Sequence, residues 1–221
     1  MIEVTYVDHM GKDLSVANAA RVSFGKKSDL DWSDPWNPPK LKEKDAKLIR
    51  YLAEHKHISP FGHCFASFHV KAPVFVARQL VKHKFLRWNE ISRRYIRSEP
   101  EFYAPDWRVS AEDKKQGSGV SMDKSERKPV DNKYEQLTKG SARTYRRMLE
   151  LGVCEEQARM VLPQSMMTEW YWSGSLDAFA DMCNLRCKPD TQYETQVVAG
   201  HIDTEMAKLF PVSWKALREN E

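Results

Sequence analysis

A nearly apolar run, residues 72–80, leads directly into a segment crowded with cations, and this junction most limits how the chain can fold. Pro73 lies near its start, where the missing N–H of a proline would be unpaired in any case, so a helix is predicted from Pro73 through Val81. Because the run is apolar, the cations that follow it lie at the end of a buried element. Arg78 and Lys82 are four residues apart and are expected on one face of this helix.

The segment 78–95 combines these cations with side chains that make directional hydrogen bonds. Arginine grips a phosphate through its planar fork, and lysine supplies a compact charge. Asn89, Glu90 and Ser92 can read a base or a sugar. A solvated basic helix face followed by a loop is the alternative interpretation. The mixture of Asn, Glu, Ser and Tyr with cations favours a site for a nucleotide or a phosphorylated cofactor.

The length and composition are those of one globular domain. The chain has 221 residues, 41% of them hydrophobic and 30% charged, and no clear linker divides it. Its longest apolar runs are far shorter than the roughly 18 residues that a membrane span requires. Residues 1–5 lack the basic and apolar regions of a secretory signal, so a cytoplasmic location is expected.

The charge balance and the cysteines exclude other classes of site. A net charge of +4, from 35 basic and 31 acidic residues, favours small anionic ligands over nucleic acid, which stays a minor alternative. Of the four cysteines, only Cys183 and Cys187 have a four-residue spacing, and a zinc site would need two further ligands nearby. No metal is therefore expected.

The periodicity of apolar residues predicts an α+β fold, a single catalytic domain over residues 1–221 with helices packed on a mostly antiparallel sheet. A stretch rich in Asp, Lys, Ser and Gly, residues 111–128, predicts a mobile loop within the broader region 108–130. Strands are expected over residues 2–7, 65–72 and 166–173, and helices over residues 14–22, 42–55, 73–81, 132–151, 176–185 and 191–209.

The cation-rich segment resembles the signature of flavin-dependent thymidylate synthases. Lys82-His83-Lys84, Asn89-Glu90, Ser92 and Arg94-Tyr95 have the spacing of that family's Arg-His-Arg, Asn-Glu, Ser and Arg-Tyr. Lysines replace the two arginines beside the histidine, and Arg87 stands where the family usually has Ser. Because Arg and Lys are not interchangeable at a bidentate site, these changes concern the flavin contacts more than the fold.

Other landmarks of the family run through nearly the whole chain. The stretch His55-Lys56-His57-Ile58-Ser59-Pro60-Phe61-Gly62-His63 resembles a family motif that has Glu where this chain has Gly62. The remaining matches are Ala20–Ser23, Phe102–Arg108, Gln116–Ser118, Arg159–Pro163, Asn184–Arg186 with Gln192 and Glu194, and Phe210–Pro211.

The resemblance implies a pocket for deoxyuridine monophosphate (dUMP). Methylation at C5 of uracil needs a nucleophilic carbon, and none of the four cysteines has the Pro-Cys context of the unrelated thiol-dependent synthases. Arg186 matches the family arginine that stabilises charge on the pyrimidine and is the catalytic candidate. A surface ion pair with Asp190 or Glu194 is its alternative role. The dUMP-binding candidates are Gln79, Lys82, Glu90, Ser92, Arg93, Arg94, Arg159 and Arg186.

The resemblance also implies FAD, reduced by NADPH, with methylenetetrahydrofolate as the one-carbon donor. The flavin supplies the redox chemistry, and the protein orients the reactants. Ser175, Asp177 and Asp181 depart from the family's Asn, Arg and amide residues, which predicts altered FAD affinity or an altered product. The FAD-binding candidates are Ser23, Ser59, Lys82, His83, Lys84, Glu90, Ser175 and Asp181.

The family further implies a homotetramer with active sites shared between subunits. Two other functions stay open. The first is flavin-dependent hydroxymethylation of dUMP, or methylation of a related pyrimidine nucleotide. The second is nucleotide binding by a protein that has lost catalysis, with Gly62, Ser175 and Asp181 as its marks.

Overall fold

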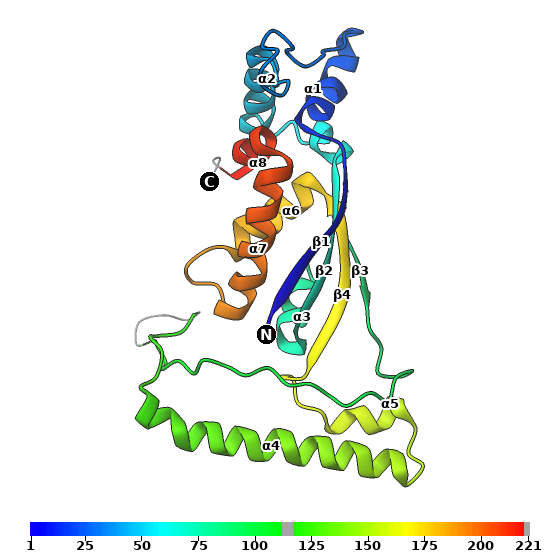
Figure 1. Ribbon diagram of the computed structural model, residues 1–221, viewed down its shortest axis with the longest axis vertical. Coiled ribbons are helices and arrows are strands. Elements are labelled where there is room, and N and C mark those ends of the chain that lie inside the picture. The colour runs from blue at the N-terminus through cyan, green and yellow to red at the C-terminus, as the bar shows by residue number, and fades with distance from the viewer. Residues whose placement is uncertain (112–116, 219–221) are drawn as a thin grey trace.

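The computed structural model describes residues 1–111 and 117–218, and its centre is a four-stranded antiparallel sheet (Figure 1). The strand order is β1-β2-β4-β3, so the two long strands β2 and β4 lie in the middle. The predicted α+β class is confirmed. The strands are β1 (Glu3–Met10), β2 (Phe65–Pro73), β3 (Leu86–Glu90) and β4 (Met167–Ser175).

Helices cover one face of the sheet and both of its ends. In Figure 1, α6 and α7 lie along the face, α1 and α2 lie beyond one end, and α4 runs across the other. Within the described ranges, none of the helices is long and apolar enough to cross a membrane. The helices are α1 (Asp13–Arg21), α2 (Glu43–Glu54), α3 (Val74–Leu80), α4 (Lys124–Glu150), α5 (Glu155–Ala158), α6 (Leu176–Arg186), α7 (Tyr193–Leu209) and α8 (Pro211–Arg218), with short 3-10 helices η1 (Val22–Phe24), η2 (Ser59–His63) and η3 (Arg159–Val161).

The core forms where alternate side chains of β2 and β4 face the helices. Phe68 lies opposite Trp172 in the strand register, and Val70 lies opposite Trp170. All four side chains are buried, and the ring of Phe179 from α6 meets both Phe68 and Trp172 edge to face. The period of two that predicted these strands therefore also selects their buried face.

The sequence did not predict β3, the short edge strand inside the cation-rich segment. Trp88 lies opposite Trp172, and Glu90 lies opposite Trp170, so both share the core-facing side of the sheet. The indole of Trp88 stacks on that of Trp170, with ring centroids 4.4 Å apart. Glu90 thus brings a carboxylate to the end of an otherwise apolar face.

The predicted start of α4 was wrong, because the helix begins at Lys124 and not near Asn132. Its first turns are polar, and contacts to a distant loop hold them. Arg127 forms ion pairs with Asp106 and Asp131, and the Trp107 indole N–H donates to Asp131 at 2.9 Å. The expected loop 108–130 is therefore helical from residue 124 onward. Residues 112–116 of that loop lie outside the described residues.

Candidate functional site

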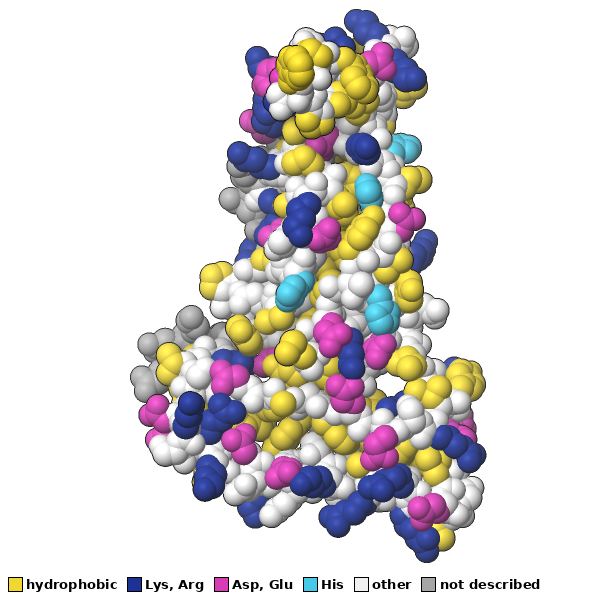
Figure 2. Space-filling model, in the orientation of Figure 1, with side chains coloured by type: hydrophobic (Ala, Val, Ile, Leu, Met, Phe, Trp, Pro, Cys, Tyr) yellow, Lys and Arg dark blue, Asp and Glu magenta, His cyan; other side chains and the backbone are white. Residues whose placement is uncertain are grey.

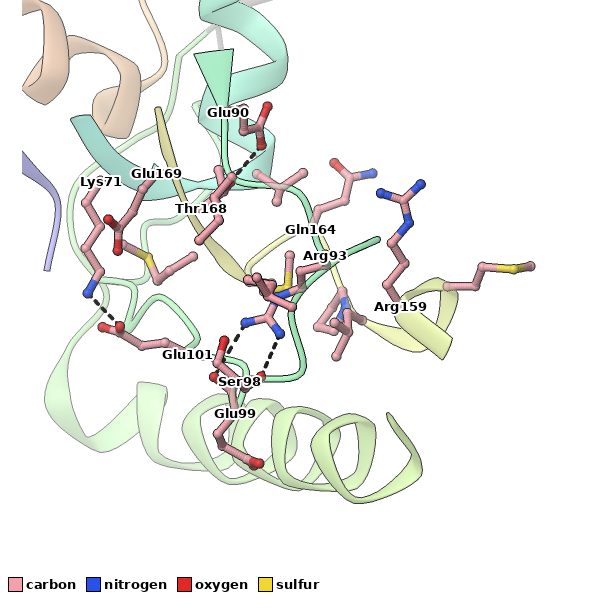
Figure 3. Close-up of a pocket in the computed structure, with 18 of the residues that line it drawn as sticks. Lys71, Glu90, Arg93, Ser98, Glu99, Glu101, Arg159, Gln164, Thr168 and Glu169 are labelled. Carbon is pink, nitrogen blue, oxygen red and sulfur yellow. Dashed lines mark hydrogen bonds and ion pairs between the residues drawn. The ribbon is translucent and has the colours of Figure 1, made fainter. Parts of the chain in front are cut away.

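Two cavities beside α3 contain most of the candidate nucleotide residues. The first, called here the Glu90 cavity, has a volume of about 550 Å³ and is lined by Glu90, Arg93 and Arg159 (Figure 3), and by Arg78 among others. Figure 2 shows an opening between the lower end of the sheet and the α4–α5 segment, where the elements that line this cavity meet.

The second cavity, called here the Arg186 cavity, has a volume of about 680 Å³. It is lined by Arg186, Lys82, Gln79 and Arg108 among others. Because α3 ends at Leu80, the prediction that Arg78 and Lys82 share one helix face was wrong. Arg78 lines the Glu90 cavity, whereas Lys82 lies in the following turn and lines the Arg186 cavity.

Three arginines from separate elements line the Glu90 cavity, together with five glutamates: Glu90, Glu99, Glu101, Glu156 and Glu169. Arg93 donates to the backbone carbonyls of Ser98, at 2.8 Å, and Glu99, at 3.4 Å, and its guanidinium lies 5.8 Å from the Tyr145 ring centroid. Arg159 donates to the carbonyl of Glu156 at 3.2 Å. Arg78 reaches the same cavity from α3. Such a group of planar cations suits the phosphate of a nucleotide.

The carboxylate of Glu90 is held on both of its oxygens. The Thr168 hydroxyl donates to Oε1 at 2.7 Å (Figure 3), and the Trp88 indole N–H donates to Oε2 at 3.1 Å. A carboxylate accepts about four hydrogen bonds, so Glu90 keeps acceptor capacity for a ligand. The cavity can therefore bind an anionic group at its arginines and a hydrogen-bond donor at Glu90.

Ser92 and Arg94 lie in the turn after β3, beside the Glu90 cavity. Ile91 and Arg93 line the cavity, and their neighbours Ser92 and Arg94 are not among its described lining residues. The backbone N–H and the Nε of Arg94 each lie 3.4 Å from the Ser92 hydroxyl. The nucleotide roles of Ser92 and Arg94 stay predictions.

Arg186 makes its principal contact with His83. Its Nε donates to His83 Nε2 at 2.9 Å, and because a guanidinium can only donate, this imidazole nitrogen is an acceptor. Burial, followed by the charge of Arg186, lowers the pKa of His83 to about 4. The neutral imidazole thus orients the candidate catalytic arginine. Glu194, one alternative partner for Arg186, forms its ion pair with Arg108.

We expect His83 to make the stability of the protein depend on pH between about 6.5 and about 4. In this window the unfolded chain binds a proton at the imidazole and the folded chain does not, so the free energy of unfolding falls as the pH falls. In His83→Gln, a side-chain oxygen still accepts from Arg186. Thermal unfolding should show a larger loss of Tm for the wild type than for this variant over that window. A constant Tm difference between the two proteins from about pH 7 down to about pH 4 would contradict this.

Gln79 is fixed by hydrogen bonds at the wall of the Arg186 cavity. The Thr195 hydroxyl donates to its Oε1 at 3.2 Å, and its Nε2 donates to Gln192. Gln192 in turn lies 3.4 Å from Glu194, which is buried and paired with Arg108. This network joins α3, the N-terminus of α7 and the loop that carries Arg108.

Most of the candidate FAD residues, apart from Glu90, lie on α6 or near one of its two ends. Ser175 is the N-cap of this helix, and Ser59 lies in η2, which packs against the same end. Ser23 follows α1, which also packs on η2. Lys82, His83 and Lys84 lie near the other end, where His83 meets Arg186, and Asp181 is exposed between the two ends.

This donor set fits an extended cofactor that carries phosphates. The 11 residues of α6 span about 16 Å, with hydroxyl groups near one end and cations near the other. Lys82 and Lys84 are both exposed, as a pyrophosphate contact requires, although each lacks the planar fork of arginine.

Two departures from the family pattern lie next to each other. A Cβ added at Gly62 would stand 3.9 Å from Oδ1 of Asp177. A glutamate at position 62, as in the family, would bring a second carboxylate near Asp177, and nearby like charges repel. Gly62 and Asp177 are therefore compatible with each other in this chain.

Three residues that organise the cavities were missed among the candidate site residues: Thr168, Trp88 and Arg108. Thr168 is buried at a position that alternates with Trp170 and Trp172, and a hydroxyl on this otherwise apolar side of the strand was the available signal. The hydrogen bond from Trp88 to Glu90 could not be predicted, because it depends on β3, a strand that the sequence did not predict. Arg108 belongs to the matched segment Phe102–Arg108, but nothing in the sequence names Glu194 as its partner.

Comparison with known proteins gives the family. A family model described as thymidylate synthase complementing protein matches residues 5–212. The UMP/dUMP methylase PolB from Streptomyces cacaoi, solved with 5-Br dUMP, superposes with a TM-score of 0.82 at 32% identity, covering 98% of this chain and 94% of that chain. Its structure with 5-Br UMP gives a TM-score of 0.84 at 30% identity, covering 99% of this chain and 94% of that chain.

Two relatives from different organisms carry the same name. A flavin-dependent thymidylate synthase of Thermus thermophilus is 39% identical over 218 residues, which cover 98% of this chain and 76% of the relative. Another, from Thermosipho melanesiensis, is 40% identical over 206 residues, which cover 92% of this chain and 83% of the relative. The family match extends over nearly all of the chain, and the protein therefore belongs to the flavin-dependent thymidylate synthase family.

Proposed function

We propose that this protein methylates dUMP to dTMP as a flavin-dependent thymidylate synthase, with FAD as its flavin, NADPH as reductant and methylenetetrahydrofolate as one-carbon donor. The relatives named above and the methylase solved with 5-Br dUMP support this function. The observation that carries it is the Glu90 cavity, which Arg93 and Arg159 line together with an oriented carboxylate. That arrangement suits a ligand with an anionic end and a hydrogen-bond donor, as a nucleotide has.

Each group of residues has a distinct task in the proposed reaction. Arg93 and Arg159 bind the phosphate, and Glu90 accepts a hydrogen bond from the sugar or base. Arg186, oriented by neutral His83, stabilises negative charge on the pyrimidine. FAD, held along α6, supplies the redox chemistry.

The active site is shared between subunits of a homotetramer. Glu90, Arg93 and Arg159 line one cavity of a chain, and Gln79, Lys82 and Arg186 line the other. A second copy that places its Arg186 cavity against the Glu90 cavity would assemble the full set. Mixing inactive Glu90→Ala and Arg186→Ala proteins under conditions that exchange subunits should then restore turnover. A mixture that exchanges subunits and stays inactive would contradict the shared site.

A second candidate substrate is UMP, because the solved neighbour is named a UMP/dUMP methylase and was also solved with 5-Br UMP. Assays with each nucleotide, followed by mass spectrometry, separate methylation of dUMP, methylation of UMP and hydroxymethylation. The product of the main reaction should be dTMP.

The absorption spectrum of the purified protein is the simplest test of the proposed function. Flavin absorbance together with dTMP formation from dUMP, methylenetetrahydrofolate, FAD and NADPH is the expected result. A protein that binds dUMP tightly but retains no flavin and forms no product would instead be a nucleotide-binding protein that has lost catalysis. The cytoplasmic location stays a prediction.

A further inference from the structure

The core-facing side of β4 has a single hydroxyl among its large apolar side chains. Thr168, Trp170 and Trp172 alternate along the strand and are all buried, with Thr168 only 4% exposed. A hydroxyl at this depth destabilises the fold unless it has a hydrogen-bond partner. Its partner is the Glu90 carboxylate, 2.7 Å away on the neighbouring strand (Figure 3).

The position of Glu90 is fixed by its strand as well as by Thr168. Glu90 lies opposite Trp170, which makes Thr168 its diagonal neighbour on the same face. The N–H of Ile91, the next residue, donates to the carbonyl of Glu169 at 2.9 Å, which continues the pairing past the end of β3. The strand pairing therefore fixes the backbone at Glu90, and the two donors, the Thr168 hydroxyl and the Trp88 indole N–H, orient its carboxylate.

We propose that Thr168 is a positioning residue for the nucleotide, acting through Glu90. Its hydroxyl, together with the Trp88 indole N–H, occupies one acceptor position on each oxygen and turns the remaining ones toward the cavity. Those positions accept a hydrogen bond from a sugar hydroxyl or a ring N–H, while the phosphate lies at the arginines. This role rests on the proposed function and adds a residue that fixes how the nucleotide is oriented.

Threonine suits this task better than serine would. Its branched Cβ restricts χ1, so the hydroxyl has few alternative directions within a strand. The residue paired with it on β2 is Ala72, which is fully buried. Valine has the same shape as threonine without the hydroxyl, so Thr168→Val removes the hydrogen bond and leaves the packing in place.

Binding of dUMP to the full-length protein, measured by calorimetry, tests the role of Thr168. Thr168→Val should weaken dUMP binding about tenfold, the effect of losing one hydrogen bond to a charged group. Thr168→Ser keeps the hydroxyl and should stay within about threefold of the wild type. Circular dichroism of each variant reports the fold, and if Thr168→Val does not fold, Thr168→Ala takes its place.

A double-mutant cycle with Glu90→Ala separates positioning from general packing. If Thr168 acts through Glu90, adding Thr168→Val to Glu90→Ala should not weaken dUMP binding further. Equal loss in both backgrounds, or unchanged binding by Thr168→Val in the wild-type background, overturns the inference and leaves the proposed function standing. A wild-type protein that does not bind dUMP overturns both.

Discussion

Replacing Arg186 by alanine should lower kcat for dTMP formation by about 10²–10³-fold, the effect of removing one donor from a site of charge development. Arg186 lines its own cavity, is half-buried, and is oriented through Nε by the neutral imidazole of His83. A positive group held in this way needs no reorganisation when charge develops on the pyrimidine. Steady-state kinetics with dUMP measures the loss.

Two further variants define what Arg186 contributes. Arg186→Lys keeps the charge and loses the planar fork, so its kcat should lie between those of the wild type and Arg186→Ala. Arg50→Ala removes an exposed arginine that pairs with Glu43 on α2, and its kcat should equal that of the wild type. A near-normal kcat for Arg186→Ala would remove the catalytic role assigned to this residue.

The long elements of the fold could be predicted because their patterns are local. In β2, alternate residues are buried, and this alternation is visible in the sequence. In β3, the strand is only five residues long, and Glu90, which is exposed at its end, lies on the same side as Trp88, where the pattern calls for an apolar side chain. The alternation of apolar side chains is broken by Glu90, a candidate dUMP-binding residue. Stacking of Trp88 on Trp170 stabilises the strand, and that contact depends on the tertiary fold.

The sequence could name residues that line the two cavities, but it could not say which residues share a cavity. Of the candidate dUMP residues, Glu90, Arg93 and Arg159 line the Glu90 cavity, Gln79, Lys82 and Arg186 line the Arg186 cavity, and Ser92 and Arg94 line neither. The resemblance could not assign these residues to separate cavities, because position in the sequence does not decide it. Even the neighbours Arg78 and Gln79 line different cavities. Likewise, no local signal joins His83 to Arg186 across 103 positions of the chain.

Replacing Arg108 by methionine should lower the free energy of unfolding by about 3–5 kcal/mol, the range for breaking a buried ion pair by removing one partner. Arg108 donates to Glu194 at 2.7 Å, and the two side chains are 17% and 5% exposed. The Arg108 guanidinium also lies 4.8 Å from the Tyr193 ring centroid and donates to the Ser118 hydroxyl at 2.7 Å. Without Arg108, the Glu194 carboxylate stays buried with only Gln192 near it among the partners described.

Variants of Glu194 distinguish an unpaired charge from lost packing in chemical denaturation. Glu194→Gln removes the buried negative charge and leaves Arg108 its contacts with Ser118 and the Asp106 carbonyl, so it should cost less than Arg108→Met. The double variant Arg108→Met with Glu194→Met replaces both charges by apolar groups and should recover most of the stability lost by Arg108→Met alone. A double variant as unstable as the sum of its single changes would mean that packing around Arg108, and not its charge, holds this loop against α7.

Because the same network fixes Gln79 through Gln192, Arg108→Met should also weaken dUMP binding. Measuring dUMP binding by the double variant then tests whether the loss of binding follows the loss of stability.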